Sequence, residues 1–413
     1  MTLATSPLAP TGFPQLPPIA GVKLATAAAG IRRNHRADLL VAEMAPGTSV
    51  AGTLTRSLCP AAPVEWCRRV LDQGDRSARA LVCNSGNANA FTGKAGEIST
   101  ELTALAVASG LGVSAESVLV ASTGLIGEPM PDEKVAAALP PLLESLQPSD
   151  KQGWQDAAEA IRTTDTFAKG SFASVNGTDA TIVGIAKGSG MIAPDMATML
   201  GFLFTDLAVA PEILQSSLSS AVNRSFNRIT VDSDTSTNDS VLLFATGAGS
   251  ADPISSTSDP RLPAFQAALE NVTLDLAQQI IRDGEGATKL VAVKVTGAVS
   301  EDSAAAIAKS IADSPLVKTA LAAGDANWGR VVMAVGKAGQ PANRDRLAIW
   351  IGPEQVAESG SVLDGYRESV ATEHLAQDEV EITVDVGVGE HQATVWTCDL
   401  THGYIEINAG YRT

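Results

Sequence analysis

The 413-residue sequence is poor in aromatic side chains, and it lacks a long uninterrupted apolar run. Aromatic residues make up 4% of the chain, so a stacking surface for bases or sugars is not expected. No segment approaches the roughly 18 uncharged apolar residues of a membrane-spanning helix. The first twenty residues have no basic segment and are broken by prolines, which is unlike a signal peptide. These absences predict a cytoplasmic protein that does not enter the membrane.

Motifs for metals, nucleotides and serine hydrolases are missing as well. The four cysteines, Cys59, Cys67, Cys83 and Cys398, lack CxxC spacing and are expected to be reduced packing residues. The four histidines are scattered, and none belongs to an HExxH motif. There is no GxGxxG, no GxxxxGK[ST] and no GxSxG. We therefore predict no metal and no tightly bound cofactor.

Composition points to a large acidic protein built from layers. The net charge is −17, which repels nucleic-acid phosphates and anionic membranes, so neither is an expected partner. Hydrophobic residues make up 45%, and alanine, valine and glycine are abundant, which favours close-packed strands and helices. This length suggests two domains, or one large layered domain with an appendage. From about Lys289 the pattern changes to a compact α/β unit.

Local patterns predict several elements. We expect a helix over 99–109, capped by Ser99 or Thr100 and stopped by Gly110. The Gly/Asn-rich stretch 84–93 is expected to be a loop, and the basic patch 32–36 a solvated turn. Strict alternation from Val380 to Val388 predicts a half-buried strand.

The most informative stretch is KGSGMIAPDMATML, residues 187–200, which is rich in glycine and nearly uncharged. One interpretation is a loop with a turn at Pro194-Asp195 that leads into a buried strand. The other is that the chain cleaves itself before Thr198 and frees an α-amine beside a hydroxyl. One residue would then supply both nucleophile and base. Local pattern alone favours the first interpretation.

Other small-residue loops offer hydroxyl groups and backbone amides. Ser122-Thr123-Gly124 at a strand end can be a simple turn or can present donors to an oxyanion. Thr163-Thr164-Asp165 follows a helix and is typical of a C-terminal turn. Lys187 is the cation of an apolar segment, so it must either reach solvent or meet an anion. Glu285 in DGEG has the pattern of a solvated loop, and the C-terminal residues that of a frayed tail.

Ten short motifs occur along the chain in the same order as in a known protein family. They are GIRRNHRADL, AAPV, CNSGNANA, STGLIG, TTDT, KGSGMIAPDMATML, NRITVDSDTSTNDS, DGEGATKL, GDANWGR and NAGYRT. Together they resemble the ornithine acetyltransferase family, the glutamate N-acetyltransferases of arginine biosynthesis. An ordered set that runs nearly end to end is far more specific than one motif. This resemblance favours self-cleavage before Thr198 over a loop that only leads into a strand.

The resemblance implies a fold and a processing event. The fold is α/β, a four-layer α/β/β/α sandwich with mixed sheets of the DmpA and ornithine acetyltransferase type. Residues 1–288 would form this core domain, and residues 289–413 a smaller α/β domain whose C-terminal tail returns to the site. Cleavage between Ala197 and Thr198 would give chains 1–197 and 198–413. Two of each would associate as a heterotetramer.

Site roles also follow from the resemblance. Thr198 would be the nucleophile, and Thr123 with Gly124 the oxyanion hole. Substrate-binding positions would be Thr163, Lys187, Thr198, Glu285, Asn408 and Thr413. The implied reaction moves acetyl from N2-acetylornithine to glutamate through an acetyl-Thr198 intermediate, with no cofactor. Acetyl-CoA would be a co-substrate in a bifunctional version.

Physical chemistry agrees with these roles. An α-amine with a pKa of about 7.7–8.0 is a usable base near neutral pH, unlike a lysine at about 10.4. Lys187 and Glu285 are a natural pair for the α-carboxylate and the side-chain ammonium of ornithine. Three departures from the family's usual pattern, Asp195, Arg162 and the LTRS segment at 54–57, remove no catalytic group.

Two competing hypotheses remain. An N-terminal-nucleophile aminopeptidase or amidase on a similar fold would use water to resolve the acyl-enzyme. A non-enzymatic binding protein would hold an anion at the Lys187 loop and stay one intact chain of 413 residues.

Overall fold

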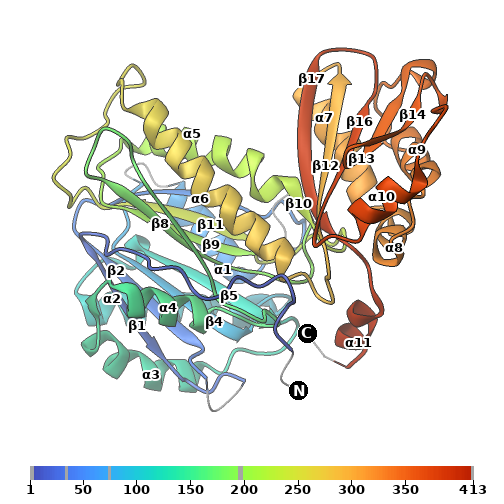
Figure 1. Ribbon diagram of the computed structural model, residues 1–413. Coiled ribbons are helices and arrows are strands. Elements are labelled where there is room, and N and C mark those ends of the chain that lie inside the picture. Colours follow the sequence, from blue (N-terminus) through green and yellow to red (C-terminus); the bar gives the residue numbers. More distant parts are fainter. Residues whose placement is uncertain (1–3, 33–35, 73–75, 194–198, 411–413) are drawn as a thin grey trace.

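A computed structural model gives the structure of the protein and describes residues 4–32, 36–72, 76–193 and 199–410. The described residues form three mixed β-sheets and eleven α-helices (Figure 1). Two of the sheets pack face to face, and helices cover their outer faces. None of the described helices has the length and apolar character needed to cross a membrane.

The first sheet has the strand order β5-β4-β2-β1-β6, in which β4 and β5 are parallel and the other pairs antiparallel. Its strands are β1 (Val22–Ala27), β2 (Leu39–Met44), β4 (Ala80–Asn87), β5 (Val118–Leu125) and β6 (Gln147–Pro148). The second sheet has the order β3-β11-β9-β8-β7, with β9 and β11 parallel. Its strands are β3 (Ser49–Leu54), β7 (Lys169–Ser174), β8 (Thr181–Lys187), β9 (Leu200–Thr205) and β11 (Ser240–Ala245).

Apolar side chains from both sheets form one continuous core. Phe204 of β9 stacks on Phe244 of β11, with ring centroids 5.2 Å apart, and Trp154 lies 5.1 Å from Phe204. All six residues of β9 are buried, as expected of a continuous apolar run in the middle of a sheet that is covered on both faces. The sandwich is therefore held together by burial between its sheets.

Helices complete the four layers. Helices α2 (Gly93–Leu111) and α3 (Asp132–Glu144) pack against the first sheet, and α5 (Pro211–Arg224) and α6 (Leu262–Arg282) pack against the second. Helices α1 (Ala62–Leu71) and α4 (Lys151–Ala160) contact strands of both sheets. The observed order of layers confirms the predicted α/β/β/α sandwich.

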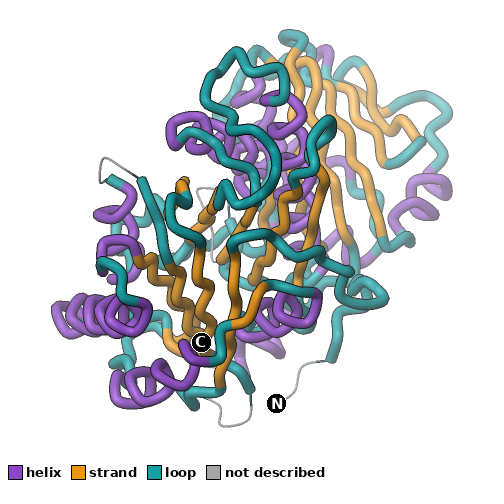
Figure 2. Tube along the Cα trace, turned by 90° about the vertical axis from the view of Figure 1, so that its left-hand side faces the viewer, coloured by secondary structure: helices purple, strands orange, loops and turns teal. Residues whose placement is uncertain are grey.

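The third sheet stands beside the sandwich, and its strands lie behind those of the sandwich in the turned view (Figures 1 and 2). Its order is β10-β17-β12-β16-β13-β14-β15. The strands are β10 (Ile229–Thr230), β12 (Leu290–Ala298), β13 (Ala348–Ile351), β14 (Glu354–Glu358), β15 (Ser361–Val362), β16 (Glu379–Asp385) and β17 (His391–Cys398). Five helices follow the sandwich in sequence: α7 (Glu301–Ala312), α8 (Pro315–Ala323), α9 (Trp328–Gly336), α10 (Glu368–Leu375) and α11 (His402–Gly410).

The third sheet begins near the predicted change of pattern. Its long strand β12 starts at Leu290, whereas its edge strand β10 comes from the preceding part of the chain. The domain boundary at 288/289 stays a prediction. Helix α11 leaves the third sheet and lies beside the sandwich (Figure 1).

Several local predictions were wrong. Helix α2 begins at Gly93 rather than near Ser99, so Ser99 and Thr100 are buried inside the helix instead of capping it. The helix runs to Leu111 and is capped by Gly112, which has a left-handed φ of +66°, so it does not stop at Gly110. Because glycines at its start weaken the helical pattern, only the tertiary packing reveals its first turns.

Two loop predictions also need correction. Residues 84–87 continue β4 because they pair with β5, so the Gly/Asn-rich loop is shorter than predicted. Within the basic patch, Arg32 is exposed as expected, but Arg36 is half-buried, and residues 33–35 lie outside the described residues. The turn predicted at Pro194-Asp195 lies outside them too.

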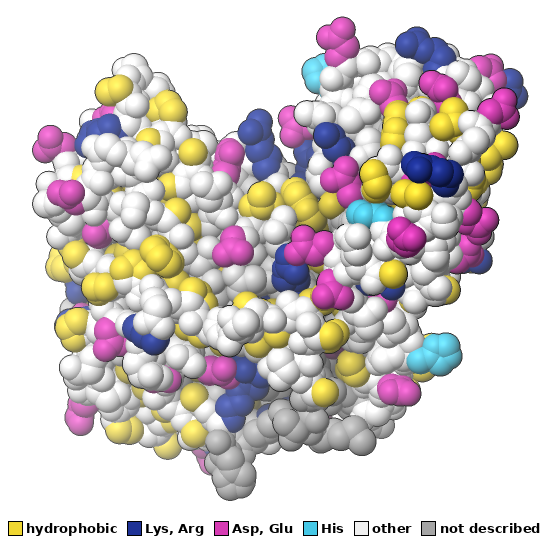
Figure 3. Space-filling model, viewed as in Figure 1, with side chains coloured by type: hydrophobic (Ala, Val, Ile, Leu, Met, Phe, Trp, Pro, Cys, Tyr) yellow, Lys and Arg dark blue, Asp and Glu magenta, His cyan; other side chains and the backbone are white. Residues whose placement is uncertain are grey.

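The cysteines are free thiols, and three of them are buried as predicted. Cys59 is exposed, so its assignment as a packing residue was wrong. The surface in Figure 3 carries acidic and basic side chains interspersed on the face shown.

Candidate functional site

The two sheets of the sandwich meet at the ends of β5 and β8. Thr123 lies near the end of β5 and is 2% exposed, and Lys187 is the last residue of β8 and is also 2% exposed. The Lys187 Nζ donates a hydrogen bond of 3.3 Å to the Thr123 Oγ1. The end of β5 therefore supplies a hydroxyl group and the end of β8 an ammonium group, and the two groups are in contact.

Gly124 fits this point because it has no side chain. Its φ is +135°, a conformation that residues with a side chain rarely adopt. A Cβ there would lie 2.3 Å from the carbonyl carbon of Gly86 in the neighbouring strand β4. The glycine thus allows the backbones of β4 and β5 to pack closely. It also leaves the end of β5 open to a pocket.

A pocket of about 320 Å³ lies at these strand ends. Six of the residues predicted for the site line it: Thr123, Gly124, Thr163, Lys187, Glu285 and Asn408. The other three predicted residues, Ala197, Thr198 and Thr413, lie outside the described residues. Residues far apart in the sequence are thus brought to one cavity.

Glu285 and Asn408 form one wall of the pocket. Glu285 is 8% exposed, and its backbone N–H donates to the Ser189 carbonyl at 2.9 Å. Gly190 makes room for it, because a Cβ there would come within 2.5 Å of the Glu285 carboxylate. The Asn408 Nδ2 donates to the Glu285 Oε2 at 2.8 Å. Glu285 is therefore not in a solvated loop, and helix α11, which carries Asn408, docks here instead of fraying.

Lys187 does not reach solvent, because it is 2% exposed, and three carboxylates lie within its electrostatic reach. Burial lowers the pKa of its ammonium, while the carboxylates of Asp165, Asp239 and Glu285 act in the opposite direction. The neighbouring ammonium of Lys169 lowers it further. Lys187 is thus a buried cation whose charge depends on the surrounding carboxylates.

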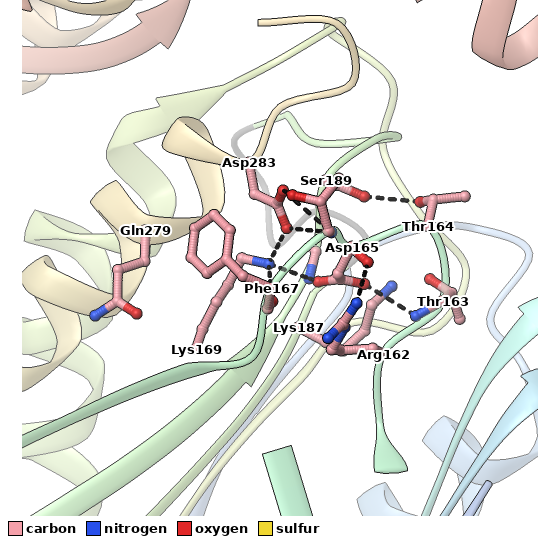
Figure 4. A network of polar contacts seen from close by, with 12 residues as sticks. Arg162, Thr163, Thr164, Asp165, Phe167, Lys169, Lys187, Ser189, Gln279 and Asp283 are labelled. Carbon is pink, nitrogen blue, oxygen red and sulfur yellow. Dashed lines mark hydrogen bonds and ion pairs between the residues drawn. The ribbon is translucent and has the colours of Figure 1, made fainter. Parts of the chain in front are cut away.

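A buried charge network lies directly beside the pocket (Figure 4). The Lys169 Nζ contacts Asp165 Oδ1 at 2.8 Å and Asp283 Oδ2 at 2.6 Å, and all three side chains are 0% exposed. Burial alone would raise the pKa of Asp165, but Lys169 and Lys187 hold it well below its usual range. We did not predict this network from the sequence. The signal was available, because Lys169 in TFAKGSF is as isolated among apolar neighbours as Lys187.

A second carboxylate fixes the segment that precedes the predicted cleavage point. The Asp232 carboxylate accepts hydrogen bonds from the backbone of Met191 at 2.7 Å and of Ile192 at 2.9 Å. The Tyr404 hydroxyl of helix α11 donates to the same carboxylate at 3.2 Å. Burial raises the pKa of Asp232. This residue lines the pocket, and its motif contributed to the resemblance, although we assigned it no role.

Asp239 is the carboxylate beside the other end of the undescribed segment 194–198. Its Oδ1 accepts the backbone N–H of Met199 at 2.9 Å, and its Oδ2 has no hydrogen-bond partner among the described residues. The side chain is 0% exposed, and burial raises its pKa well above the usual value. The neighbouring Asn238 donates to the carbonyls of Ala88 and Ser122 and so joins this loop to β5.

The pocket carries charges of both signs. Its basic lining residues are Arg32, Arg36, Arg162 and Lys187, and its acidic lining residues are Asp38, Asp232, Asp234 and Glu285. Such a cavity suits a small molecule with both a carboxylate and an ammonium. In the described part of the chain, no group of three or more His, Cys, Asp or Glu side chains is arranged to hold a metal ion.

Comparison with known proteins gives consistent results. The model of the ArgJ family matches residues 23–413. The chain is 54% identical to the arginine biosynthesis bifunctional protein ArgJ of Nitrobacter winogradskyi and 51% identical to that of Agrobacterium fabrum; both matches cover 100% of each chain. Among solved structures, the arginine biosynthesis bifunctional protein argJ of Bacillus halodurans is 43% identical over 50% of this chain and 96% of its own, with a TM-score of 0.48.

Proposed function

The chain belongs to the ArgJ family, and on that premise we propose that it is an acetyltransferase of arginine biosynthesis that cleaves itself before Thr198. It transfers acetyl from N2-acetyl-L-ornithine to L-glutamate, giving L-ornithine and N-acetyl-L-glutamate. Thr198 carries the acetyl group between the two amino acids.

The proposed chemistry needs one nucleophile and one base. The Thr198 hydroxyl first attacks the Ala197 carbonyl carbon, and the C–N bond between Ala197 and Thr198 breaks, which frees the Thr198 α-amine. Water then hydrolyses the resulting ester, which releases the Ala197 carboxylate and restores the hydroxyl. In catalysis the α-amine accepts the hydroxyl proton while the oxygen attacks the acetyl carbonyl carbon. The C–N bond then breaks, and the leaving ornithine nitrogen takes the proton. The glutamate amine later attacks the acetyl ester, the acyl C–O bond breaks, and the proton that this amine loses returns to the Thr198 oxygen through the α-amine.

The pocket residues take the supporting roles. The Thr123 hydroxyl and the Gly124 backbone N–H are proposed to stabilise the oxyanion that forms at the acetyl oxygen. Lys187 binds the substrate α-carboxylate, and Glu285 binds the ornithine ammonium. Thr163, Asn408 and Thr413 complete the binding set.

One observation carries the proposal: six predicted site residues line a single pocket, and they come from both sides of the proposed cut. Thr123, Gly124, Thr163 and Lys187 precede it, whereas Glu285 and Asn408 follow it. The second sheet is shared in the same way, because β3, β7 and β8 come before the cut and β9 and β11 after it. Such sharing supports two products that stay associated.

Intact mass and N-terminal sequencing of the purified protein test the processing step. We expect a fragment that begins Thr198-Met199-Leu200, and a Thr198→Ala protein that stays whole and loses acetyl transfer by about 10³-fold or more. Thr257→Ala, an exposed threonine outside the pocket, is the matched control and should cleave and transfer normally. Cleavage of the Thr198→Ala protein at the same bond would sink the mechanism.

Labelled acetyl distinguishes the transferase from the amidase alternative. With acetylornithine and glutamate both present, label is expected in N-acetylglutamate, whereas a hydrolase would release it as acetate. Supplying acetyl-CoA in place of acetylornithine tests the bifunctional version, in which acetyl-CoA is the co-substrate and no bound cofactor is needed. The heterotetramer and the cytoplasmic location stay part of this proposal, and the elution volume of the processed protein tests the former.

A further inference from the structure

Asp165 connects two segments that line the pocket. Its Oδ2 accepts the backbone N–H of Thr163 at 2.9 Å, and its Oδ1 accepts the backbone N–H of Gly188 at 2.6 Å. Thr163 and Lys187, the residue before Gly188, are both predicted substrate-binding residues. The Asp165 side chain is 0% exposed, so its carboxylate does not face solvent. One buried side chain therefore sets the position of two binding segments.

Asp165, Asp283 and Lys169 together carry one negative charge that Lys169 does not neutralise, and Lys187 can compensate it. Lys169 is shared between Asp165 and Asp283, so one ammonium faces two carboxylates. A buried charge is costly unless another charge compensates it. Lys187 is buried as well and brings the total to two cations and two anions.

We propose that Asp165 is a positioning residue for acetyl transfer: its carboxylate fixes the backbone at Thr163 and Gly188 and serves as the counter-charge of Lys187. This inference rests on the proposed function, because it assumes that Lys187 binds the substrate carboxylate. Asp165 acts through these neighbours and does not touch the substrate.

Asp165 also influences the pH at which Lys187 loses its charge. The groups that act most strongly on Lys187 are Asp165, Lys169, Asp239 and Glu285, and the Cys83 thiol also lies within its electrostatic reach. Of these, Asp165 is the strongest influence that keeps the ammonium charged. Removing its charge lowers the pKa of Lys187 further, so the cation that holds the substrate is lost at a lower pH.

The test compares Asp165→Asn with Asp283→Asn in the self-processed protein. Both variants remove one carboxylate from Lys169, but Asp283 is not among the groups that act most strongly on Lys187. The measurement is kcat/KM for acetylornithine as a function of pH, which reports the first half-reaction. For Asp165→Asn we expect the alkaline limb to move to lower pH by about 1 unit, with a rise in KM of about tenfold. For Asp283→Asn the limb should stay in place.

Equal shifts in both variants, or no shift in Asp165→Asn, would overturn the proposal. A wild-type protein without acetyl transfer would refute the proposed function instead, so the two failures are distinguishable. Lys187→Met gives a second test in case Asp165→Asn is not recovered in a folded form. Without Lys187 the Asp165 carboxylate loses a cation that stabilises it, so the midpoint of acid unfolding should move to higher pH. An unchanged midpoint would contradict the pairing.

Discussion

The surroundings of the pocket and the core of the third sheet are both buried, but they bury different groups. In the third sheet, Val291, Val293 and Val295 of β12 and Ile382 of β16 belong to an apolar core. Beside the pocket, Asp165, Lys169, Lys187 and Asp283 are buried although all can carry charge. The first region is stable through a pattern that each strand carries by itself. The second depends on partners that are more than a hundred positions apart, as Lys169 and Asp283 are.

The largest predicted effect concerns the buried charges. Lys169→Met leaves Asp165 and Asp283 without their shared cation, and we expect the free energy of unfolding to fall by about 3–5 kcal/mol. Lys294→Met in β12 is the matched control, because Lys294 is only partly buried and should change stability by less than about 0.5 kcal/mol. Denaturant unfolding of both variants measures the difference. An equal loss of unfolding free energy in both variants would show that the two regions do not differ in their dependence on buried charge.

The second variant, Asp239→Asn, should stabilise the protein, whereas Lys169→Met destabilises it. Burial raises the pKa of Asp239, so this carboxyl favours the folded state at low pH and becomes unfavourable as the pH rises through its folded-state pKa. Asp239→Asn keeps an acceptor for the Met199 N–H and removes the charge, so the melting temperature should rise. The rise should be larger at pH 8 than at pH 4.

Asp345→Asn near the third sheet is the comparison for that experiment. Asp345 is exposed and pairs with the exposed Arg344, so the substitution should bring no gain that grows with pH. Melting temperatures over the same pH range check both variants. A drop in the melting temperature of Asp239→Asn at pH 8 would show that its charge is compensated in the folded protein.

The smallest effect belongs to the apolar core of the third sheet. Ile382→Val in β16 removes one buried methylene and should cost about 0.5–1.5 kcal/mol. The KM for acetylornithine should not change, because Ile382 does not line the pocket. Thermal unfolding and initial rates provide the two readouts. A changed KM would indicate that the third sheet is coupled to the site.

Local pattern was reliable where an element depends on its own residues. β9 and β16 were predicted from a continuous apolar run and from alternation, and both are strands, although β16 ends at Asp385 and not at Val388 as predicted. Helix α2 was placed too late because its first turn contains Gly93 and Gly96, whose helical state depends on packing and on contacts with the preceding loop. The continuation of β4 through Asn87 was missed because it needs the partner strand β5.

The site shows the same division. Ordered motifs identified Thr123, Gly124, Thr163, Lys187, Glu285 and Asn408, and the structure brings all six to one pocket. The predicted roles of these residues, and those of Ala197, Thr198 and Thr413, stay predictions. Asp165 and Lys169 were not recognised. The apolar neighbours of Lys169 indicated a buried cation, but the sequence does not show which carboxylates it meets.

The sequence by itself determined the family, the order of the elements and the residues available for chemistry, since these follow from local pattern and from motifs in a fixed order. Only the tertiary structure decided that Lys187 is buried among carboxylates rather than extended to solvent, and that helix α11 returns to Glu285. The physical reason is that the state of a charge depends on its solvation and its neighbours. Those neighbours come from distant parts of the chain.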